Sequence, residues 1–144
     1  MARKVVWTVF LVGGCIWCLA LASRAETSVT EPDAITFEPA APISALMYGQ
    51  QTFYKTLRSE LATPATAGRN GEIAYAAGVL AELANVNRHH NDKADYRQWA
   101  TKLRDTALDL AKEASKTTQA DNTQMNKLYL SIKQTCANCH DIYQ

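Results

Sequence analysis

The sequence lacks a basic run, a strand-like alternation and any large excess of charge. Its 144 residues include 15 Lys and Arg and 14 Asp and Glu, for a formal net charge of +1. Lys and Arg neither cluster nor interleave with aromatic residues, so nothing favours a nucleic-acid partner. No segment alternates between apolar and polar residues as a half-buried strand does, and this absence argues against a β-rich fold.

The N-terminal 25 residues have the pattern of a secretory signal peptide. Arg3 and Lys4 form a positive start, residues 5–22 are uncharged and mostly apolar, and small residues precede a cleavage position after Ala25. Cleavage there removes three basic residues and no acidic ones, which leaves 12 Lys and Arg against 14 Asp and Glu. This near balance says little about the partner.

Two other interpretations of this leader remain open. The apolar stretch of 18 residues (5–22) is just long enough to span a bilayer, so an uncleaved membrane anchor is one alternative. The residues 12–15, Val-Gly-Gly-Cys, loosely resemble a lipoprotein cleavage box. All three interpretations predict a periplasmic or otherwise exported domain, which contacts the membrane only if the leader is retained.

Cysteine is scarce once the leader is set aside. Only Cys136 and Cys139 remain, and with His140 they form the pattern C-x-x-C-H, the attachment signal of a c-type haem. On a helix the two thiols share a face about one turn apart, where they can add across the two vinyl groups of one porphyrin edge. We therefore expect one covalently attached haem c, with His140 as the proximal iron ligand. Export supports this prediction, because c-type haem is attached outside the cytoplasm.

Three other interpretations of the motif were weighed. The cysteines alone would also fit a structural disulfide. A redox dithiol of the thioredoxin type needs a βαβ context, which the sequence does not offer. A zinc half-site needs further ligands, and His89 and His90 are the only other imidazoles. The same two histidines would be the candidates for a bis-histidine haem, although they look like a solvated helix end.

Apolar residues recur three and four apart over most of the remaining chain. Residues 26–41 form a Pro-containing linker without a helical period, and residues 42–144 form one domain. The expected helices cover 42–62, 71–89, 93–115 and 123 to nearly the end of the sequence, with Asp121 or Asn122 as a cap for the last. Four amphipathic helices joined by short loops predict an all-α, antiparallel four-helix bundle.

With the motif placed on the last helix, the chain resembles the class II c-type cytochromes, cytochrome c′ and its low-spin relative cytochrome c-556. The resemblance covers about 42–143. It is most specific over 135–143, where the motif is followed by two residues and the aromatic Tyr143, and looser in Ser44-Ala45-Leu46-Met47 of the first helix. Members of that family usually carry a basic residue after the terminal aromatic, whereas this chain has Gln144.

The resemblance implies that a residue of the first helix closes the distal face of the iron. Two alignments of that helix are open. One gives the distal position to Leu46, which implies a five-coordinate iron that binds NO or CO. The other gives it to Met47, which implies a low-spin electron carrier, because thioether ligation raises the reduction potential. Ordinary core packing is the third interpretation of Met47.

Other residues are weaker candidates for contact with a haem. Tyr96 and Trp99 lie on the inner face of the third predicted helix, where they would pack against the porphyrin, form an aromatic core, or both. Candidates for hydrogen bonds or ion pairs with the propionates, each also explained by ordinary packing or solvation, are Tyr54, Arg58, Arg88 and Arg104.

The sequence thus predicts a non-enzymatic, exported, mono-haem cytochrome that carries single electrons between periplasmic redox partner proteins. A protein that binds a diatomic gas at a vacant distal site is the alternative, and a haem-free structural bundle is a third class. The resemblance also raises a homodimer through the first two helices. Gly49 and Gly78 would then either permit close approach or be incidental.

Overall fold

The computed structural model describes residues 37–144, which form four α-helices and one short 3-10 turn without any strand in that range. The predicted leader at 1–25 and most of the predicted linker lie outside the described residues. No helix of the described part is long and apolar enough to cross a membrane. The elements are α1 (Ile43–Leu61), α2 (Ala67–Asn87), α3 (Ala94–Ala114), η1 (Thr117–Gln119) and α4 (Asn122–Tyr143).

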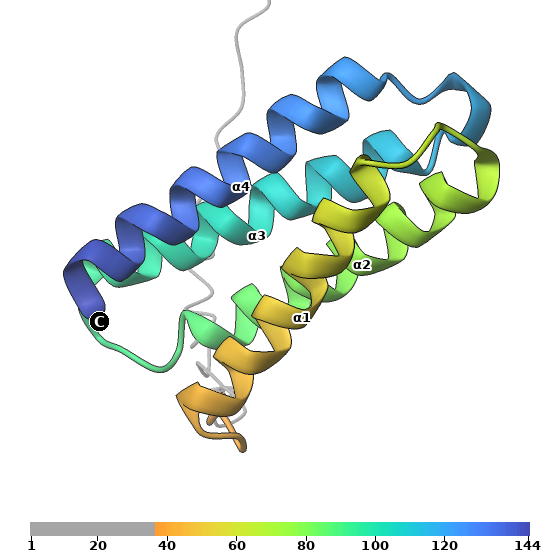
Figure 1. Ribbon diagram of the computed structural model, residues 1–144. Helices are drawn as coiled ribbons and strands as arrows, with labels where there is room; N and C mark the ends of the chain where they lie inside the picture. Colours follow the sequence, from red (N-terminus) through yellow and green to blue (C-terminus); the bar gives the residue numbers. More distant parts are fainter. Residues whose placement is uncertain (1–36) are drawn as a thin grey trace, which may run out of the picture. The chain divides into compact units, whose positions relative to one another are not determined.

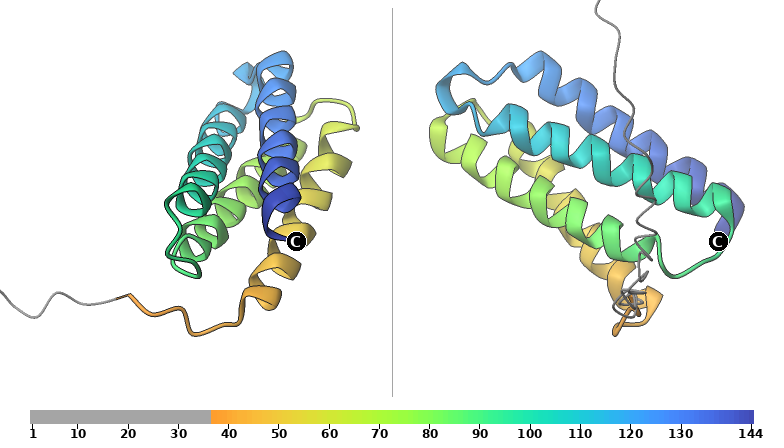
Figure 2. Two further views of the ribbon diagram at one scale, coloured as in Figure 1. Left: turned by 90° about the vertical axis from the view of Figure 1, so that its left-hand side faces the viewer. Right: turned by 180° about the vertical axis from the view of Figure 1, so that it is seen from behind.

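The four helices form a bundle in which short connections place each helix beside the preceding one (Figure 1). The contact between α2 and α3 is the most extensive, followed by those of α1 with α2 and α3 with α4. The contact between α1 and α4 is the smallest among the neighbouring helices, and both further views show α4 beside α3 (Figure 2). The predicted all-helical class is therefore confirmed.

The core consists mainly of the apolar stripes that the sequence predicts. Leu57 of α1, Ile73 of α2, Leu110 of α3 and Ile132 of α4 are fully buried. Alanines fill much of the space between α2 and α3, which lets these two helices pack closely. The fully or almost fully buried alanines are Ala76, Ala77, Ala81, Ala84, Ala107 and Ala114.

One helix boundary differs clearly from its prediction. The sequence predicts that the second helix begins at Gly71, yet α2 already begins at Ala67. Thr66 is the reason, because its hydroxyl oxygen accepts the backbone N–H of Arg69 at 3.1 Å and so caps the helix four residues earlier than expected. The same helix ends at Asn87, two residues before the predicted end.

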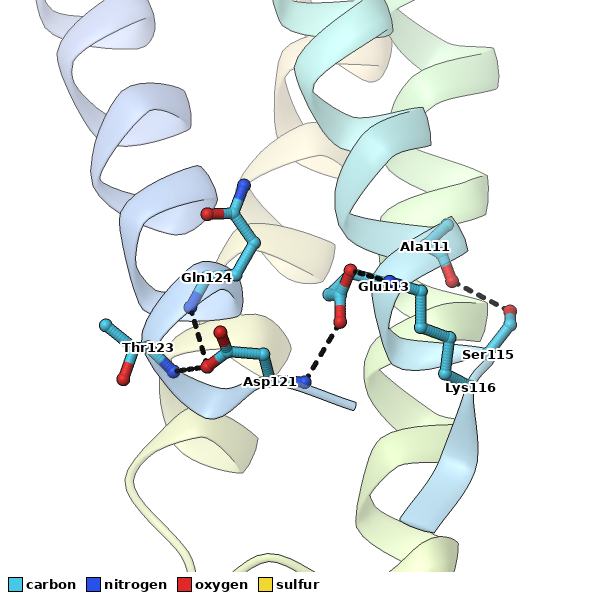
Figure 3. Close-up of polar contacts among 7 residues, drawn as sticks. All are labelled: Ala111, Glu113, Ser115, Lys116, Asp121, Thr123 and Gln124. Atoms are coloured by element: carbon cyan, nitrogen blue, oxygen red, sulfur yellow. Dashed lines mark hydrogen bonds and ion pairs between the residues drawn. The ribbon is translucent and has the colours of Figure 1, made fainter. Parts of the chain in front are cut away.

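The α3–α4 connection is closed by carboxylates (Figure 3). Asp121 caps α4 as predicted, because its side chain accepts the backbone N–H groups of Thr123 at 2.8 Å and Gln124 at 3.2 Å. Glu113, near the end of α3, accepts the backbone N–H of Asp121 at 2.9 Å and also pairs with Lys116. These contacts fix where α4 starts, and therefore where its last turns lie.

A buried arginine, which the sequence pattern does not predict, joins the ends of three helices. Arg69 is 7% exposed, and its Nε donates to the backbone oxygen of Glu60 at 2.8 Å. Its Nη1 donates to Oδ1 of Asn122 at 2.7 Å, so the guanidinium connects α1, α2 and α4. Its Nη2 donates to the backbone oxygen of Leu61 at 3.3 Å, a carbonyl at the C-terminus of α1 that has no partner within the helix.

Candidate functional site

The two cysteines and the histidine of the motif lie in the last two turns of α4. Cys136 and Cys139 are free thiols, and both are half-buried. Burial raises the pKa of Cys136 to about 11, with a smaller contribution from Cys139. Burial, followed by the Asp95 carboxylate, also raises the pKa of Cys139. Both sulfurs are therefore protonated thiols at neutral pH, and a thiol is the group that adds to a vinyl carbon.

A cavity of about 520 Å³ lies on one side of the motif. Most of its wall comes from α1 and α4, the neighbouring helices with the least mutual contact. Its volume falls within the roughly 300–1,000 Å³ that is usual for cofactor sites. The lining residues are Met47, Tyr48, Gln50, Gln51, Tyr54, Leu80, Lys133, Cys136, His140 and Gln144.

A second, much smaller cavity of about 20 Å³ reaches the motif from the side of α3, and it has room for about one water molecule. Cys139 lines this cavity together with Trp99, Asn87, Ala100, Leu103 and Thr135. Four side chains line both cavities, and they are Met47, Gln50, Cys136 and His140. The motif and the first half of α1 therefore contribute to the walls of both cavities.

Met47 and Leu46 occupy different environments, although they are adjacent in sequence. Met47 is partly exposed and lines both cavities with His140. Leu46 is 6% exposed and lines neither of them. Successive residues differ by about 100° around a helix, so the two side chains emerge on different sides of α1. The structure brings Met47 to the motif histidine and leaves Leu46 in the core.

The side chains of this region fit a haem c. Of two thiols one helical turn apart, Cys136 lines both cavities and Cys139 lines the small one; the His140 imidazole follows directly, and the Met47 thioether of α1 lines both cavities. A porphyrin supplies four nitrogen ligands to its iron, so the protein needs to provide only axial ligands. A structural zinc site needs four protein ligands, and within residues 37–144 no three His, Cys, Asp or Glu side chains gather into a metal-binding group.

The two aromatic candidates of α3 differ in their surroundings. Trp99 lines the small cavity beside Cys139, and Nζ of Lys102 lies 5.6 Å from the centroid of its ring. Tyr96 lines neither cavity, and its hydroxyl donates to Oδ1 of Asn87 at 2.7 Å. Trp99 is therefore within the site, whereas Tyr96 belongs to the packing behind it.

Of the predicted propionate partners, only Tyr54 reaches the large cavity, where its ring stacks on that of Tyr129 at a centroid distance of 5.3 Å. The guanidinium candidates line neither cavity, and these are Arg58, Arg88 and Arg104. The cation that does line the large cavity is Lys133, which sequence reasoning missed. Its signal was its position, three residues before Cys136 on the same helix face.

His89 and His90 are not brought to the motif. They lie in the α2–α3 connection and line a separate surface hollow with residues 91–93. The ring of His89 packs instead against that of Phe37 at 4.5 Å. This arrangement does not support a bis-histidine iron site.

Gly49 is explained by packing within the chain. A Cβ at this position would lie 3.1 Å from Cδ1 of Leu83, so the missing side chain lets α1 approach α2 closely. A Cβ at Gly78 would meet nothing within 4 Å. Of these two glycines, only Gly78 therefore has open space beside it, where a helix of a second copy would have room to approach.

The chain matches no model of a known protein family, no curated protein and no solved structure. The resemblance to the class II c-type cytochromes therefore stays a prediction that depends on the motif and on the placement of the side chains around it.

Proposed function

We propose that this protein is an exported mono-haem c-type cytochrome, an antiparallel four-helix bundle that carries single electrons between redox partner proteins. Haem c is attached to Cys136 and Cys139, with His140 as the proximal ligand and Met47 as the distal ligand of the iron. The observation that carries the proposal is that Met47 and His140, from α1 and α4, line the same two cavities together with Cys136.

The cysteines bind by addition, without a leaving group. Each thiol adds its sulfur to one carbon of a vinyl group and its hydrogen to the other, so one thioether bond forms for each S–H bond that breaks. Because α4 is a regular helix through 122–143, the two sulfurs are held at a fixed spacing. The helix thereby orients the attached haem, and the protein loses little conformational entropy on binding it.

His140 and Met47 set the chemistry at the two axial positions. A bound haem supplies an iron that gains one electron on reduction and loses it on reoxidation. A thioether opposite an imidazole favours the ferrous state and raises the reduction potential. Met47 also fills the distal position, so that a diatomic gas has to displace it before binding. This placement supports electron transfer over gas binding, because Leu46 is outside both cavities.

More of the surface that lines the large cavity is apolar than polar. The large cavity is lined by the aromatic ring of Tyr54 and the apolar side chain of Leu80, with few charged groups. Low polarity around a metal centre reduces the rearrangement that accompanies a change in charge. Lys133 is the charged exception, and it lies at an exposed position of α4.

The proposal is tested by haem staining of the full chain on a denaturing gel, after expression in a host that attaches c-type haem outside its cytoplasm. Thioether-bound haem survives denaturation, so the wild-type band should stain. The Cys136→Ala/Cys139→Ala double variant should not stain, whereas Thr135→Ser, a conservative change beside the motif, should. A wild-type band without stain would refute the proposal and favour the haem-free structural bundle.

A further inference from the structure

We propose that Tyr143 is a positioning residue, whose hydrogen bond to Asp95 holds the last turn of α4, and with it His140, against α3. The consequence for the iron depends on the function proposed above, whereas the contact itself does not. The two residues are 48 positions apart in sequence, so their contact is tertiary.

His140 lies in the last turn of α4, which needs a contact with another helix to stay in place. The helix α4 ends at Tyr143, three residues after His140, and its cap is the N–H of Gln144, which donates to the backbone oxygen of His140 at 3.1 Å. The last four carbonyls of a helix have no intrahelical partner, and terminal turns open more readily than helix interiors. An axial ligand in such a turn would vary in orientation unless another element held it.

The Tyr143–Asp95 hydrogen bond supplies that contact. The hydroxyl of Tyr143 donates to Oδ1 of Asp95 at 2.6 Å. Among the side-chain hydrogen bonds of residues 37–144, it is the one that joins the last turn of α4 to another helix. Tyr143 follows Cys139 by four residues and His140 by three, so the three side chains emerge from neighbouring positions on the helix surface. Holding Tyr143 therefore resists rotation of this turn about the helix axis.

Asp95 is well placed as the acceptor. It lies in the first turn of α3, where the helix dipole favours a negative charge, and its Oδ1 also accepts the backbone N–H of Tyr96 at 2.9 Å. The bond to Tyr143 lowers the pKa of Asp95 and raises the pKa of Tyr143 to about 12. At neutral pH the carboxylate is thus ionised and the phenol protonated, which is the charge-assisted form of the hydrogen bond.

The ring of Tyr143 is held as well as its hydroxyl. The ring of Tyr96 packs edge-on against it, with centroids 5.1 Å apart and planes at 89°. Nζ of Lys93 lies 5.3 Å from the centroid of the Tyr143 ring. Tyr96 is itself 5% exposed and hydrogen-bonded to Asn87 of α2. The last turn of α4 is therefore seated on a surface that α2 and α3 jointly hold in place.

The test compares Tyr143→Phe, which removes one oxygen and keeps the ring, with Tyr75→Phe, which removes the same atom from an exposed tyrosine of α2. Both are prepared as full chains with attached haem. Amide hydrogen exchange of residues 140–144 should be roughly 3- to 10-fold faster in Tyr143→Phe, the factor expected for losing one hydrogen bond. The ferric electron paramagnetic resonance signal should broaden, since His140 would adopt a wider range of orientations. Tyr75→Phe should change neither.

Asp95 provides an independent variant from the other side of the bond. Asp95→Ala should reproduce the faster exchange, and Asp95→Asn, whose amide oxygen still accepts a hydrogen bond, should restore most of the protection. Unchanged exchange and an unchanged signal in both Tyr143→Phe and Asp95→Ala would overturn the proposal while the wild-type band still stains for haem. A wild-type chain without stain would refute the proposed function alone, because the exchange comparison still decides whether the Tyr143–Asp95 contact holds the last turn of α4.

Discussion

At the scale of single residues, the proposed function depends on which of two adjacent side chains of α1 reaches the motif. Met47 lines both cavities with His140, whereas Leu46 is buried outside them. A thioether is an iron ligand and an isobutyl group is not. If Leu46 instead of Met47 lay beside His140, the iron of the proposed haem would have no distal ligand from α1 and would bind small gases.

We predict that Met47→Ala converts the ferric protein from low spin to high spin and allows CO to bind the ferrous form, because the distal ligand is lost. Leu46→Ala is the matched control. It should keep the low-spin spectrum and lower the free energy of unfolding by about 2–5 kcal/mol, as truncation of a buried leucine does. Absorption spectra and urea unfolding separate the two effects, and a low-spin Met47→Ala protein would show that another group ligates the iron.

At the scale of the helices, the end of the bundle that carries Arg69 fixes how α1, α2 and α4 meet. The guanidinium donates to Glu60 and Asn122 within 2.8 Å, and Asn70 donates to the backbone oxygen of Thr117 at 2.6 Å. These contacts lie at the N-terminal end of α4, whereas the motif lies at its C-terminal end. They set the path of α4 and so help to define the width of the cavity between α1 and α4.

We expect Arg69→Met to lower the free energy of unfolding by about 2–3 kcal/mol, because the buried Oδ1 of Asn70 and the partly buried oxygens of Leu61 and Asn122 lose a donor while most of the side-chain volume is kept. Arg58→Met, at an exposed position of α1, should change it by less than about 0.5 kcal/mol. Urea denaturation followed by circular dichroism measures both. Equal stability of the two variants would mean that water replaces the Arg69 donors without loss.

The α3–α4 connection predicts a pH dependence. Glu113 accepts a hydrogen bond from the backbone N–H of Asp121 and pairs with Lys116. Both contacts lower the pKa of Glu113 below its usual value. A carboxyl with a lowered pKa in the folded state stabilises above its unfolded pKa, and this contribution is lost as pH falls through the folded value. The melting temperature of Glu113→Gln should therefore lie below that of the wild type at pH 7, and the difference should shrink as pH falls from about 4.3, the usual pKa of Glu, through the lower folded value.

The control for this comparison is Glu82→Gln, at an exposed position of α2. Its melting temperature should follow that of the wild type across the same pH range. A difference between Glu113→Gln and wild type that persists unchanged into acid would show that shape, and not charge, accounts for the effect.

At the scale of the whole molecule, the sequence predicts the helices and the motif. It does not predict which side chain of each helix faces the site. Apolar residues three and four apart predict the buried faces, because such spacing follows the helical repeat. Leu46 and Met47 are both apolar, so the same pattern cannot say which one faces α4. That choice depends on how α1 packs on α2, where Gly49 approaches Leu83.

Long polar side chains were the second source of error. Arg69 is buried, although an arginine would ordinarily be assigned to the solvated surface, and Lys133 lines the large cavity from an exposed position. The early start of α2 was missed for a related reason, since Thr66 acts through a single local hydrogen bond within a segment that is rich in turn-forming residues. The burial of Arg69 depends on tertiary contacts that no periodicity encodes, whereas the Thr66 cap is local.

The most direct test of the account is the optical spectrum of the exported full chain, ferric and ferrous, with and without CO. Ligation by both His140 and Met47 predicts a low-spin spectrum that does not respond to CO, with a weak sulfur-to-iron band in the near-red of the ferric form. A high-spin spectrum that shifts on addition of CO would contradict Met47 ligation and make gas binding the function. A chain without haem absorption would contradict the proposed function itself.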